Sequence, residues 1–459
     1  MGSEYHFLRS RKWYSDPADP ADPTRIITAD MKPEYQRQEH TASYYAATAR
    51  DTTRYPVLQG AHTADICIVG AGFTGIASAL TLAERGYSVA VVEANRVAWG
   101  ASGRNGGQLI GGFSGDKKIV KHFGPEVART IWDMRWRGHE IVHERVQKYS
   151  IACDLKSGYI DVAKNRRETG YLEEDLANLE KYRFPWDYRL LSKEETRSTL
   201  GTGAYAAGLI NMRNGHLHPL NLCAGEARAA HQLGVQIFEQ SPVTNIVHGR
   251  KPRVETAQGY VEANTVLLAG HVFHRLEQQR LSGTTFQAGS FIMATEPLPE
   301  AIRNEINPQD LAVCEVSNII DYYRLSADGR LLYGGRTNYS GRVPASIRAS
   351  LEPRMLKVYP GLKGVSIDYE WGGSIGIVIR RIPMVGRIDD NIYYVQGYSG
   401  HGVNTTHIMG EIVADAIGGT MERFDLFAKM PQIRIPGGNA FGNQIVALGM
   451  LYYRLKDLL

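Results

Sequence analysis

The sequence predicts an α/β domain built on a parallel sheet, combined with a second unit that is rich in strands. The first is indicated by a strand–glycine turn–helix–strand pattern at residues 65–94 and by a strand–glycine turn–helix pattern at residues 391–417. The second is indicated by strand-like runs from Ile151 onward and by strand-like alternation over residues 280–380. A chain of 459 residues is long enough to hold both units.

The pattern at residues 65–94 contains the motif G-x-G-x-x-G. A short apolar run ends at Val69, and the glycines at positions 70, 72 and 75 follow it at the start of a helix expected over residues 74–85. The first glycine permits a tight turn, the second lets a phosphate approach the backbone, and the third lets helix and strand pack closely. The sequence therefore predicts a Rossmann-like dinucleotide site.

An acidic residue completes this unit. Residues 88–92 read as a second strand, and Glu93 follows them at the carboxyl end. A carboxylate in this place accepts hydrogen bonds from ribose hydroxyls, which favours an unphosphorylated ribose. The expected cofactor is therefore FAD or NAD rather than NADP, and the alternative is a glycine turn in an ordinary α/β unit.

Three further stretches are rich in small residues. The loop Gly100–Gly112 would be costly to order unless it wraps a ligand, with Ser102, Asn105 and Gln108 as polar contacts; the alternative is a plain surface loop. Strands are expected at residues 260–263 and 265–269, and Gly270 follows the second of them at another place where the chain can pass close to a cofactor.

The third stretch is the turn GYSGHGVNTT at residues 397–406. It precedes a helix expected over residues 407–417, and a helix N-terminus carries partial positive charge and free N–H donors. Such a terminus would stabilise the negative charge of a reduced flavin, whereas a nicotinamide has no such need. This turn therefore favours FAD over NAD, with a simple αβ turn as the alternative.

Composition narrows the class of protein. A net charge of +4 is small for this length and predicts neither nucleic acid nor a membrane surface as a partner. The four cysteines lie far apart, which argues against a disulfide framework and for a reducing, cytoplasmic compartment. No apolar stretch is long enough for an integral membrane segment, and the N-terminus lacks the apolar region of a secretory signal.

The alternation of patterns predicts a discontinuous domain organisation. The expected order is an irregular N-terminal arm at residues 1–60; a cofactor domain at residues 61–150, 216–275 and 383–425; a substrate domain at residues 151–215 and 276–382; and a C-terminal tail helix at residues 426–459.

Several blocks carry a resemblance to a known family. The motifs GAGFTG, ASGRNGGQ and GYSGHGVN resemble those of FAD-dependent amine and amino-acid oxidases of the D-amino-acid oxidase and sarcosine oxidase type. The resemblance runs from about Thr41 to Leu459. Within this family, residues 215–222, residues 321–335 and the YYRLKD tail look most like bacterial gamma-glutamylputrescine oxidases.

The resemblance implies both a fold and a reaction. The fold class is α/β plus α+β, with a Rossmann-like FAD domain on a parallel sheet and a discontinuous substrate domain on a large antiparallel sheet. The reaction is hydride transfer from a small N-substituted or γ-glutamyl-capped amine to flavin N5, hydrolysis of the imine to an aldehyde, and reduction of O2 to H2O2. Alternatives are an oxidase of sarcosine, proline or pipecolate, a dehydrogenase that uses an electron carrier, and a non-catalytic FAD subunit. The oligomeric state stays open.

The resemblance also places the flavin contacts. The matching region GSIGIVIRRIPMVG has no cysteine, so the FAD is expected to be non-covalent. The expected cofactor-binding residues are Gly70, Gly72, Phe73, Thr74, Gly75, Glu93, Ala94, Ser102, Gly103, Asn105, Gly106, Gln108, Val243, Ala269, Gly270, Gly400, His401, Gly402 and Val403.

Four residues are expected at the catalytic centre. The resemblance places Arg381 where relatives have a carboxylate-binding arginine, with a surface or structural ion pair as the alternative. It places Arg336 near the position where sarcosine oxidases have a lysine that helps oxygen react, with a solvated strand-end arginine as the alternative. Tyr322 and Tyr323 point to opposite faces of the expected strand, so that one lines the pocket while the other packs in the core, and Tyr323 is taken as the pocket residue. His401 would contact the flavin edge or cap its turn. No metal is expected, because His216 and His218 have no third ligand in spacing.

Overall fold

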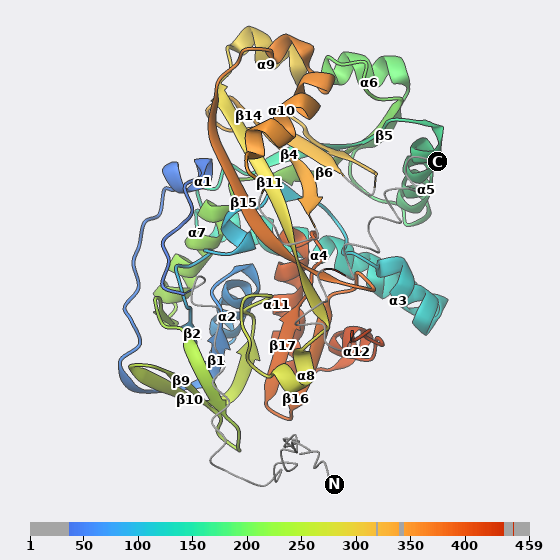
Figure 1. Cartoon of the computed structure of the whole chain (residues 1–459). Helices are drawn as coiled ribbons and strands as arrows, with labels where there is room; N and C mark the ends of the chain where they lie inside the picture. Colours follow the sequence, from blue (N-terminus) through green and yellow to red (C-terminus); the bar gives the residue numbers. More distant parts are fainter. Residues whose placement is uncertain (1–35, 318–319, 339–343, 436–443, 445–459) are drawn as a thin grey trace, which may run out of the picture.

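A computed structural model describes residues 36–317, 320–338, 344–435 and 444, and these form two sheets with helices around them (Figure 1). The eight-stranded sheet lies in the lower half of the view and the nine-stranded sheet in the upper half. The chain passes between the two sheets repeatedly, so each of them is assembled from segments far apart in the sequence. The domain boundaries given above remain predictions.

The eight-stranded sheet has a parallel centre. Its path is β16-β17-β10-β1-β2-β7, in which β17, β10, β1, β2 and β7 run parallel, β16 is an antiparallel edge, and β9 joins β8 to β10. Two strands expected at residues 260–263 and 265–269 form one strand. The strands are β1 (Gly60–Val69), β2 (Val89–Val92), β7 (Gln236–Phe238), β8 (Val243–Val247), β9 (Arg253–Thr256), β10 (Gly259–Leu268), β16 (Met384–Asp389) and β17 (Ile392–Gln396).

Helices α2 (Phe73–Glu84), α7 (Pro219–Gln232) and α11 (Val403–Ile417) pack together on one face of this sheet, with α4 (Ala128–Lys148) against α11. Small residues allow the close crossings: a Cβ on Gly410 would lie 3.0 Å from the backbone of α2. α11 begins four residues before the helix expected at residues 407–417, because the turn that precedes it is shorter than the glycine pattern indicates.

The nine-stranded sheet is mostly antiparallel. Its path is β15-β11-β14-β13-β12-β4-β6-β3, with β5 paired to β6, and only β12 and β4 run parallel. One face packs on α10 (Ile347–Val358). The strands are β3 (Gln108–Leu109), β4 (Lys156–Ala163), β5 (Tyr188–Leu191), β6 (Ala207–His216), β11 (Thr285–Pro297), β12 (Ala312–Glu315), β13 (Asp321–Leu325), β14 (Arg330–Asn338) and β15 (Ile367–Val378).

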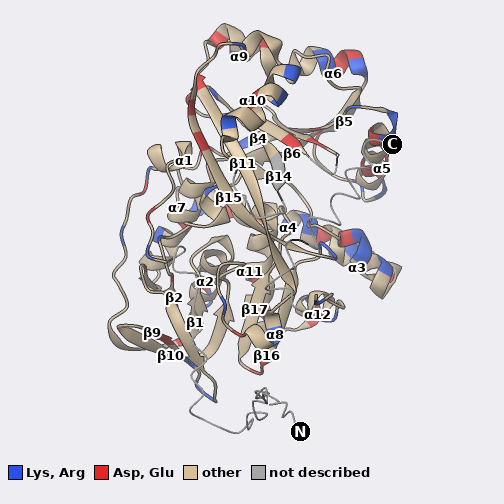
Figure 2. Ribbon diagram, viewed as in Figure 1, with Lys and Arg blue, Asp and Glu red and all other residues tan. Residues whose placement is uncertain are grey.

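The remaining helices lie around the two sheets, and three of them, α3, α6 and α9, carry both signs of charge (Figure 2). Within the described part of the chain, no helix combines the length and apolarity that crossing a membrane requires. The tail helix predicted at residues 426–459 is wrong over residues 429–435, because the helix Glu422–Ala428 ends before them and residues 431–435 have no regular structure. The rest of the predicted helix lies outside the described residues, apart from residue 444. These helices are α1 (Tyr44–Ala47), α3 (Asp116–Phe123), α5 (Arg166–Lys181), α6 (Lys193–Leu200), α8 (Gln278–Leu281), α9 (Glu300–Ile306) and α12 (Glu422–Ala428).

Candidate active site

A cavity of about 1250 Å³ lies where the parallel strands end and the second sheet begins. It exceeds the ~300–1,000 Å³ of an ordinary small-molecule site, so it has room for a dinucleotide and a second small molecule. All the predicted cofactor residues except Gly75 and Gly103 line it, as do two of the predicted catalytic residues, Arg381 and His401. The turns near residues 72, 270 and 400, which are remote in sequence, therefore converge on one cavity.

The glycines of the first turn make the backbone approach that a phosphate needs. Gly70 has a φ of +108°, and a Cβ there would lie 2.9 Å from the backbone of Ala269. A Cβ on Gly72 would lie 2.9 Å from the Ser102 hydroxyl, and α2 has no side-chain cap at this residue. Gly75 does not line the cavity because its Cα faces the Gly70 carbonyl, where a Cβ would lie 1.8 Å from the oxygen. Its role is close packing.

The loop at residues 100–112 is held by its own polar groups. Ser102 Oγ accepts from the Phe73 N–H at 2.8 Å, and the Asn105 side chain donates to the carbonyls of Ala101 and Ser102. Gln108 Nε2 donates to the Val313 carbonyl at 2.9 Å, which joins the loop to the second sheet. These side chains order the loop that lines the cavity, and Gly103 packs against the Ala98 carbonyl beneath it.

Glu93 lies at the end of β2 with its carboxylate at the cavity wall. It accepts from the N–H of Ala71 at 2.7 Å and from the N–H of Asn95 at 2.9 Å. Burial raises the pKa of Glu93 to about 7, although these backbone donors oppose the shift. A carboxylate has about four acceptor positions, so these two hydrogen bonds leave capacity for ribose hydroxyls.

The turn before α11 presents backbone to the cavity. Gly400 has a φ of +93°, and α11 starts at Gly402 without a side-chain cap. His401 Nε2 lies 3.2 Å from the Ile110 carbonyl, and burial lowers the pKa of His401, so the neutral ring donates this hydrogen bond. The Thr74 and Tyr398 hydroxyls lie 2.6 Å apart and tie this turn to α2.

The second sheet contributes Tyr322 to the cavity, and not the predicted Tyr323. The Tyr322 ring lies close to Gly106 and Gly334, where added Cβ atoms would come within 2.6 and 2.3 Å of it, and its hydroxyl lies 3.4 Å from Ser290 Oγ. Tyr323 is 1% exposed in the core on the opposite face, and its hydroxyl bonds to that of Tyr359. The choice of Tyr323 is wrong, because strand alternation turns it away from the cavity.

Of the two arginines predicted at the catalytic centre, the structure places the side chain of Arg381 only. Arg381 lines the cavity beside Lys118, whose Nζ donates to the Arg380 carbonyl at 2.9 Å. Burial lowers the pKa of Lys118, and the charges of Arg381 and Arg380 lower it further, so this part of the wall is strongly positive. The backbone of Arg336 lies in β14, but its side chain is outside the described residues.

One part of the cavity, between β4, β6, α4 and α5, contains two carboxyl groups that the sequence motifs did not predict, those of Asp161 and Asp175. Asp161 accepts from the Tyr159 hydroxyl at 2.8 Å, and burial raises the pKa of Asp161 to about 7, with the charge of Asp175 contributing. Burial also raises the pKa of Asp175. The alternation of Tyr159 and Asp161 on one strand was the available signal. The other lining residues here are Trp132, Trp136, Asn178, Asn211 and Asn214.

The two histidines weighed as metal ligands have structural partners. His218 Nδ1 accepts from the Asn221 N–H and caps α7, and His216 Nε2 donates to the Asp310 carbonyl. Among residues 36–317, 320–338 and 344–435, no group of three potential ligands comes together.

Comparison with known proteins gives the family. Residues 65–416 match the DAO family, described as FAD dependent oxidoreductase. The chain belongs to this family. It is therefore an FAD-dependent oxidoreductase.

The relatives agree with this assignment. The chain is 41% identical to gamma-glutamylputrescine oxidoreductase of Escherichia coli over 92% of this chain and 99% of that one, and 39% identical to the probable oxidoreductase OrdL of Haemophilus influenzae over 92% and 98%. Glycine oxidase from Geobacillus kaustophilus has the same fold, with a TM-score of 0.68, 20% identity, and 81% and 100% of the two chains covered. L-proline dehydrogenase from P. horikoshii gives a TM-score of 0.66 at 19% identity, over 80% and 96%.

The residues present fit the cofactor of this family. The cradle at Gly70 and Gly72 leaves no space for a Cβ but exposes backbone, which suits a pyrophosphate. The Glu93 carboxylate suits a ribose, and the uncapped start of α11 offers N–H donors that would suit the negative charge of a reduced isoalloxazine. The cysteines in the described residues are buried and free, and Cys314, which lines the cavity, has a pKa raised by burial.

Proposed function

We propose that this protein is a non-covalent FAD-dependent oxidase of a small amine that carries a carboxylate at its far end, as a γ-glutamyl-capped putrescine does. The observation that carries the proposal is one cavity with walls of both signs: Arg381 and Lys118 in one part, Asp161 and Asp175 in another. A substrate with an ammonium and a carboxylate matches such a wall. The printed name of the E. coli relative, gamma-glutamylputrescine oxidoreductase, supports the same substrate class.

FAD, when bound, would supply the two-electron acceptor for oxidation of the amine to the imine, with O2 as the final acceptor and H2O2 as its product. The residues of the chain bind and orient the substrate. Arg381 holds the carboxylate through its guanidinium fork, and Asp161 and Asp175 attract the ammonium into the cavity. Tyr322, between Gly106 and Gly334, fixes the aliphatic stem in the cavity. The imine product is hydrolysed to an aldehyde and ammonia.

The test is anaerobic reduction of the purified yellow protein by a panel of amines. We expect gamma-glutamylputrescine to bleach the visible spectrum, with sarcosine and proline much slower, and air to restore the colour with release of peroxide. No bleaching by any amine would contradict the proposal. Bleaching without peroxide would identify a dehydrogenase instead, and a yellow pellet after acid precipitation would contradict non-covalent FAD.

Substrate recognition can be tested separately with two amines that differ in the carboxylate. In Arg381→Gln we expect the KM for gamma-glutamylputrescine to rise at least tenfold, which corresponds to ~1.4 kcal/mol, with a smaller change for putrescine. An equal change for both amines would show that Arg381 does not bind the cap. Arg189→Gln is a matched control, because its ion pair with Glu195 lies on the exposed surface.

A further inference from the structure

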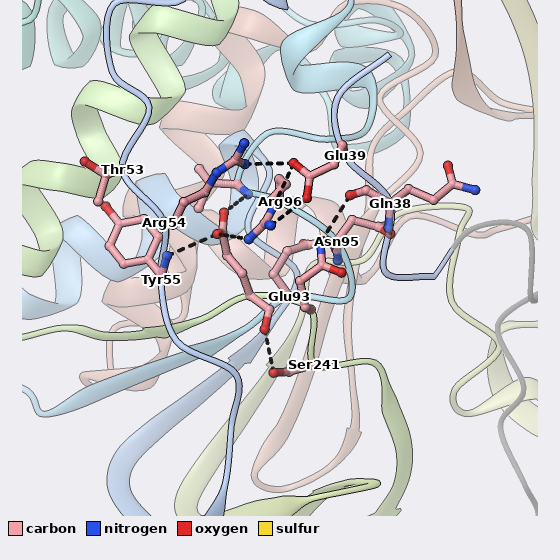
Figure 3. A network of polar contacts seen from close by, with 12 residues as sticks. Gln38, Glu39, Thr53, Arg54, Tyr55, Glu93, Asn95, Arg96 and Ser241 are labelled. Atoms are coloured by element: carbon pink, nitrogen blue, oxygen red, sulfur yellow. Dashed lines mark hydrogen bonds and ion pairs between the residues drawn. The ribbon is translucent and has the colours of Figure 1, made fainter.

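The chain before β1 lies against the end of the cavity formed by β2, and Figure 3 shows the contacts. The Arg37 N–H donates to the Ala94 carbonyl at 3.0 Å, and the Gln38 N–H donates to Asn95 Oδ1 at 2.8 Å. Ala94 and Asn95 both line the cavity, next to Glu93. The N-terminal segment (residues 36–58) is therefore packed on the ribose end of the site.

A chain of alternating charges runs through the same place. Glu39 pairs with Arg54 at 3.0 Å and with Arg96 at 2.5 Å (Figure 3). Arg96 also pairs with Glu239 at 2.9 Å. Glu239 is 1% exposed and also accepts from the N–H groups of Tyr55 and Val97. Arg96 is thus the cation that compensates a buried carboxylate, while Glu39 on the N-terminal segment holds its guanidinium from outside.

Glu239 and Glu93 are close neighbours. The Glu93 N–H donates to the Phe238 carbonyl, the Ser241 N–H donates to the Glu93 carbonyl, both at 2.8 Å, and Glu239 lies between these two residues. Burial is the main cause that raises the pKa of Glu93, and the negative charge of Glu239 raises it further. Arg96 is the ion-pair partner of Glu239, at 2.9 Å, and so offsets that charge. On the α7 side, the titratable group that faces Glu93 is the buried thiol of Cys223.

We propose that Arg96, held between Glu39 and Glu239, is a positioning residue for the ribose end of FAD, because its ion pair with Glu239 compensates the buried charge beside Glu93, the carboxylate expected to accept the ribose hydroxyls. The inference rests on the proposed non-covalent FAD site, and not on the proposed substrate. It gives the N-terminal segment a role, since Glu39 orients the guanidinium.

The test is the pH dependence of FAD release from the holoenzyme, followed by the fluorescence of free flavin. Glu93 binds ribose only when ionised, so the wild type should lose FAD as the pH falls through the range where this carboxyl takes up a proton. In Arg96→Gln, Glu239 is uncompensated, and we expect this loss to move to higher pH by about one unit, with about tenfold weaker binding near neutral pH. Glu93→Gln should remove this pH dependence.

Further variants separate a positioning role of Arg96 from a simple loss of structure, because they should shift FAD release in the opposite direction or restore it. Glu239→Gln removes the neighbouring negative charge and should move FAD release to lower pH, and the double variant Arg96→Gln/Glu239→Gln should return toward the wild-type profile. Arg96→Lys keeps the charge and should retain most of the wild-type profile. Arg85→Gln, which breaks an ion pair with Asp415 at the other end of α2, is the control and should match the wild type.

Two outcomes would overturn the inference: a pH profile of Arg96→Gln that superimposes on the wild type, or a double variant that is shifted as far as Arg96→Gln alone. Both leave the FAD site intact. A wild-type protein that holds no FAD at any pH would instead contradict the proposed function on which the inference rests.

Discussion

At the scale of the residue, the neighbouring tyrosines of β13 show how one strand serves two environments. Tyr322 lines the cavity and Tyr323 lies in the core against α10. In Tyr322→Phe we expect kcat/KM for the amine to fall, because a hydroxyl in the cavity is lost. The expected loss of transition-state stabilisation is ~0.5–1.5 kcal/mol. Steady-state kinetics with gamma-glutamylputrescine measure this.

Tyr323→Phe is the matched control for that prediction. It removes the hydroxyl that bonds to Tyr359 at 3.3 Å, so the free energy of unfolding should fall by ~0.5–1.5 kcal/mol while kcat/KM stays unchanged. The assignment of the two faces would be contradicted if Tyr323→Phe altered the kinetics and Tyr322→Phe did not.

Residue-level prediction from sequence succeeded where a local backbone constraint dictates the residue type. Gly70, Gly72 and Glu93 could be placed at the cavity because turn geometry, phosphate approach and strand end are all encoded within thirty residues. Asp161 and Asp175 could not, since they come from β4 and α5 and meet only after folding. The choice between Tyr322 and Tyr323 depended on sheet register, which alternation alone does not give.

At the scale of the element, the crossing of α4 and α11 depends on one glycine. A Cβ on Gly138 would lie 2.4 Å from the Asn404 carbonyl oxygen, and Asn404 holds the loop at Gly112 through its Nδ2. Gly138→Ala must therefore push the first turn of α11 away. We expect a loss of ~1–3 kcal/mol in the free energy of unfolding, together with weaker FAD binding.

Gly170 provides the control for this substitution. It lies in α5, is exposed, and has nothing within 4 Å of an added Cβ. Gly170→Ala should stabilise the protein by ~0.5–1 kcal/mol, because alanine loses less backbone entropy in a helix. Denaturant unfolding of both variants checks the pair, and destabilisation by Gly170→Ala as large as by Gly138→Ala would refute the crossing argument.

His248 joins three elements of the parallel-sheet half in a pH-dependent way. It follows β8, and its ring nitrogens lie 2.7 Å from Glu277 and 2.5 Å from Asp389 at the end of β16. Burial lowers the pKa of His248, but the two carboxylates outweigh burial and raise it overall. The folded-state pKa therefore exceeds the unfolded value of about 6.5.

The sign of the effect follows from linkage. The stability that protonated His248 contributes is fully present below the unfolded pKa and is lost as the pH rises through the folded pKa. The difference in unfolding free energy between the wild type and His248→Gln should therefore be larger near pH 6 than near pH 9. Urea unfolding at both pH values measures it, and a constant difference would mean that the ring stays neutral.

The boundaries of a helix or strand can be predicted where its flanking turn residues and its hydrophobic periodicity are both distinct, as for α2. They are harder to predict where these signals are weak. The helix at residues 166–181 has no counterpart among the predicted elements, although Asn165 caps the Glu168 N–H. Its apolar face is a narrow stripe of Leu172, Leu176 and Leu179 in a stretch that is otherwise mostly charged. β10 was split in two because Asn264 interrupts an apolar run. In the structure β10 is one continuous strand, because it pairs with β1 over its whole length.

At the scale of the whole molecule, the cavity joins the two sheets, so ligand binding should stabilise the chain as a unit. FAD that binds only the folded protein should raise the free energy of unfolding by ~2.7 kcal/mol at a free concentration one hundred times Kd. Thermal melts of apoprotein with increasing FAD measure the rise in Tm. Riboflavin lacks the adenosine part that we propose to lie at Glu93, so it should act more weakly, and an equal effect would contradict this placement.

The strand order β17-β10-β1-β2 has a consequence for biosynthesis. β1 is translated first, its partner β10 about two hundred residues later, and β17 more than one hundred residues after that. At ~5–20 residues per second, a nascent chain carries an incomplete sheet edge for tens of seconds before its neighbours leave the ribosome. The polypeptide can capture its coloured prosthetic group only near the end of translation, so truncation before α11 should yield aggregates rather than a smaller flavoprotein.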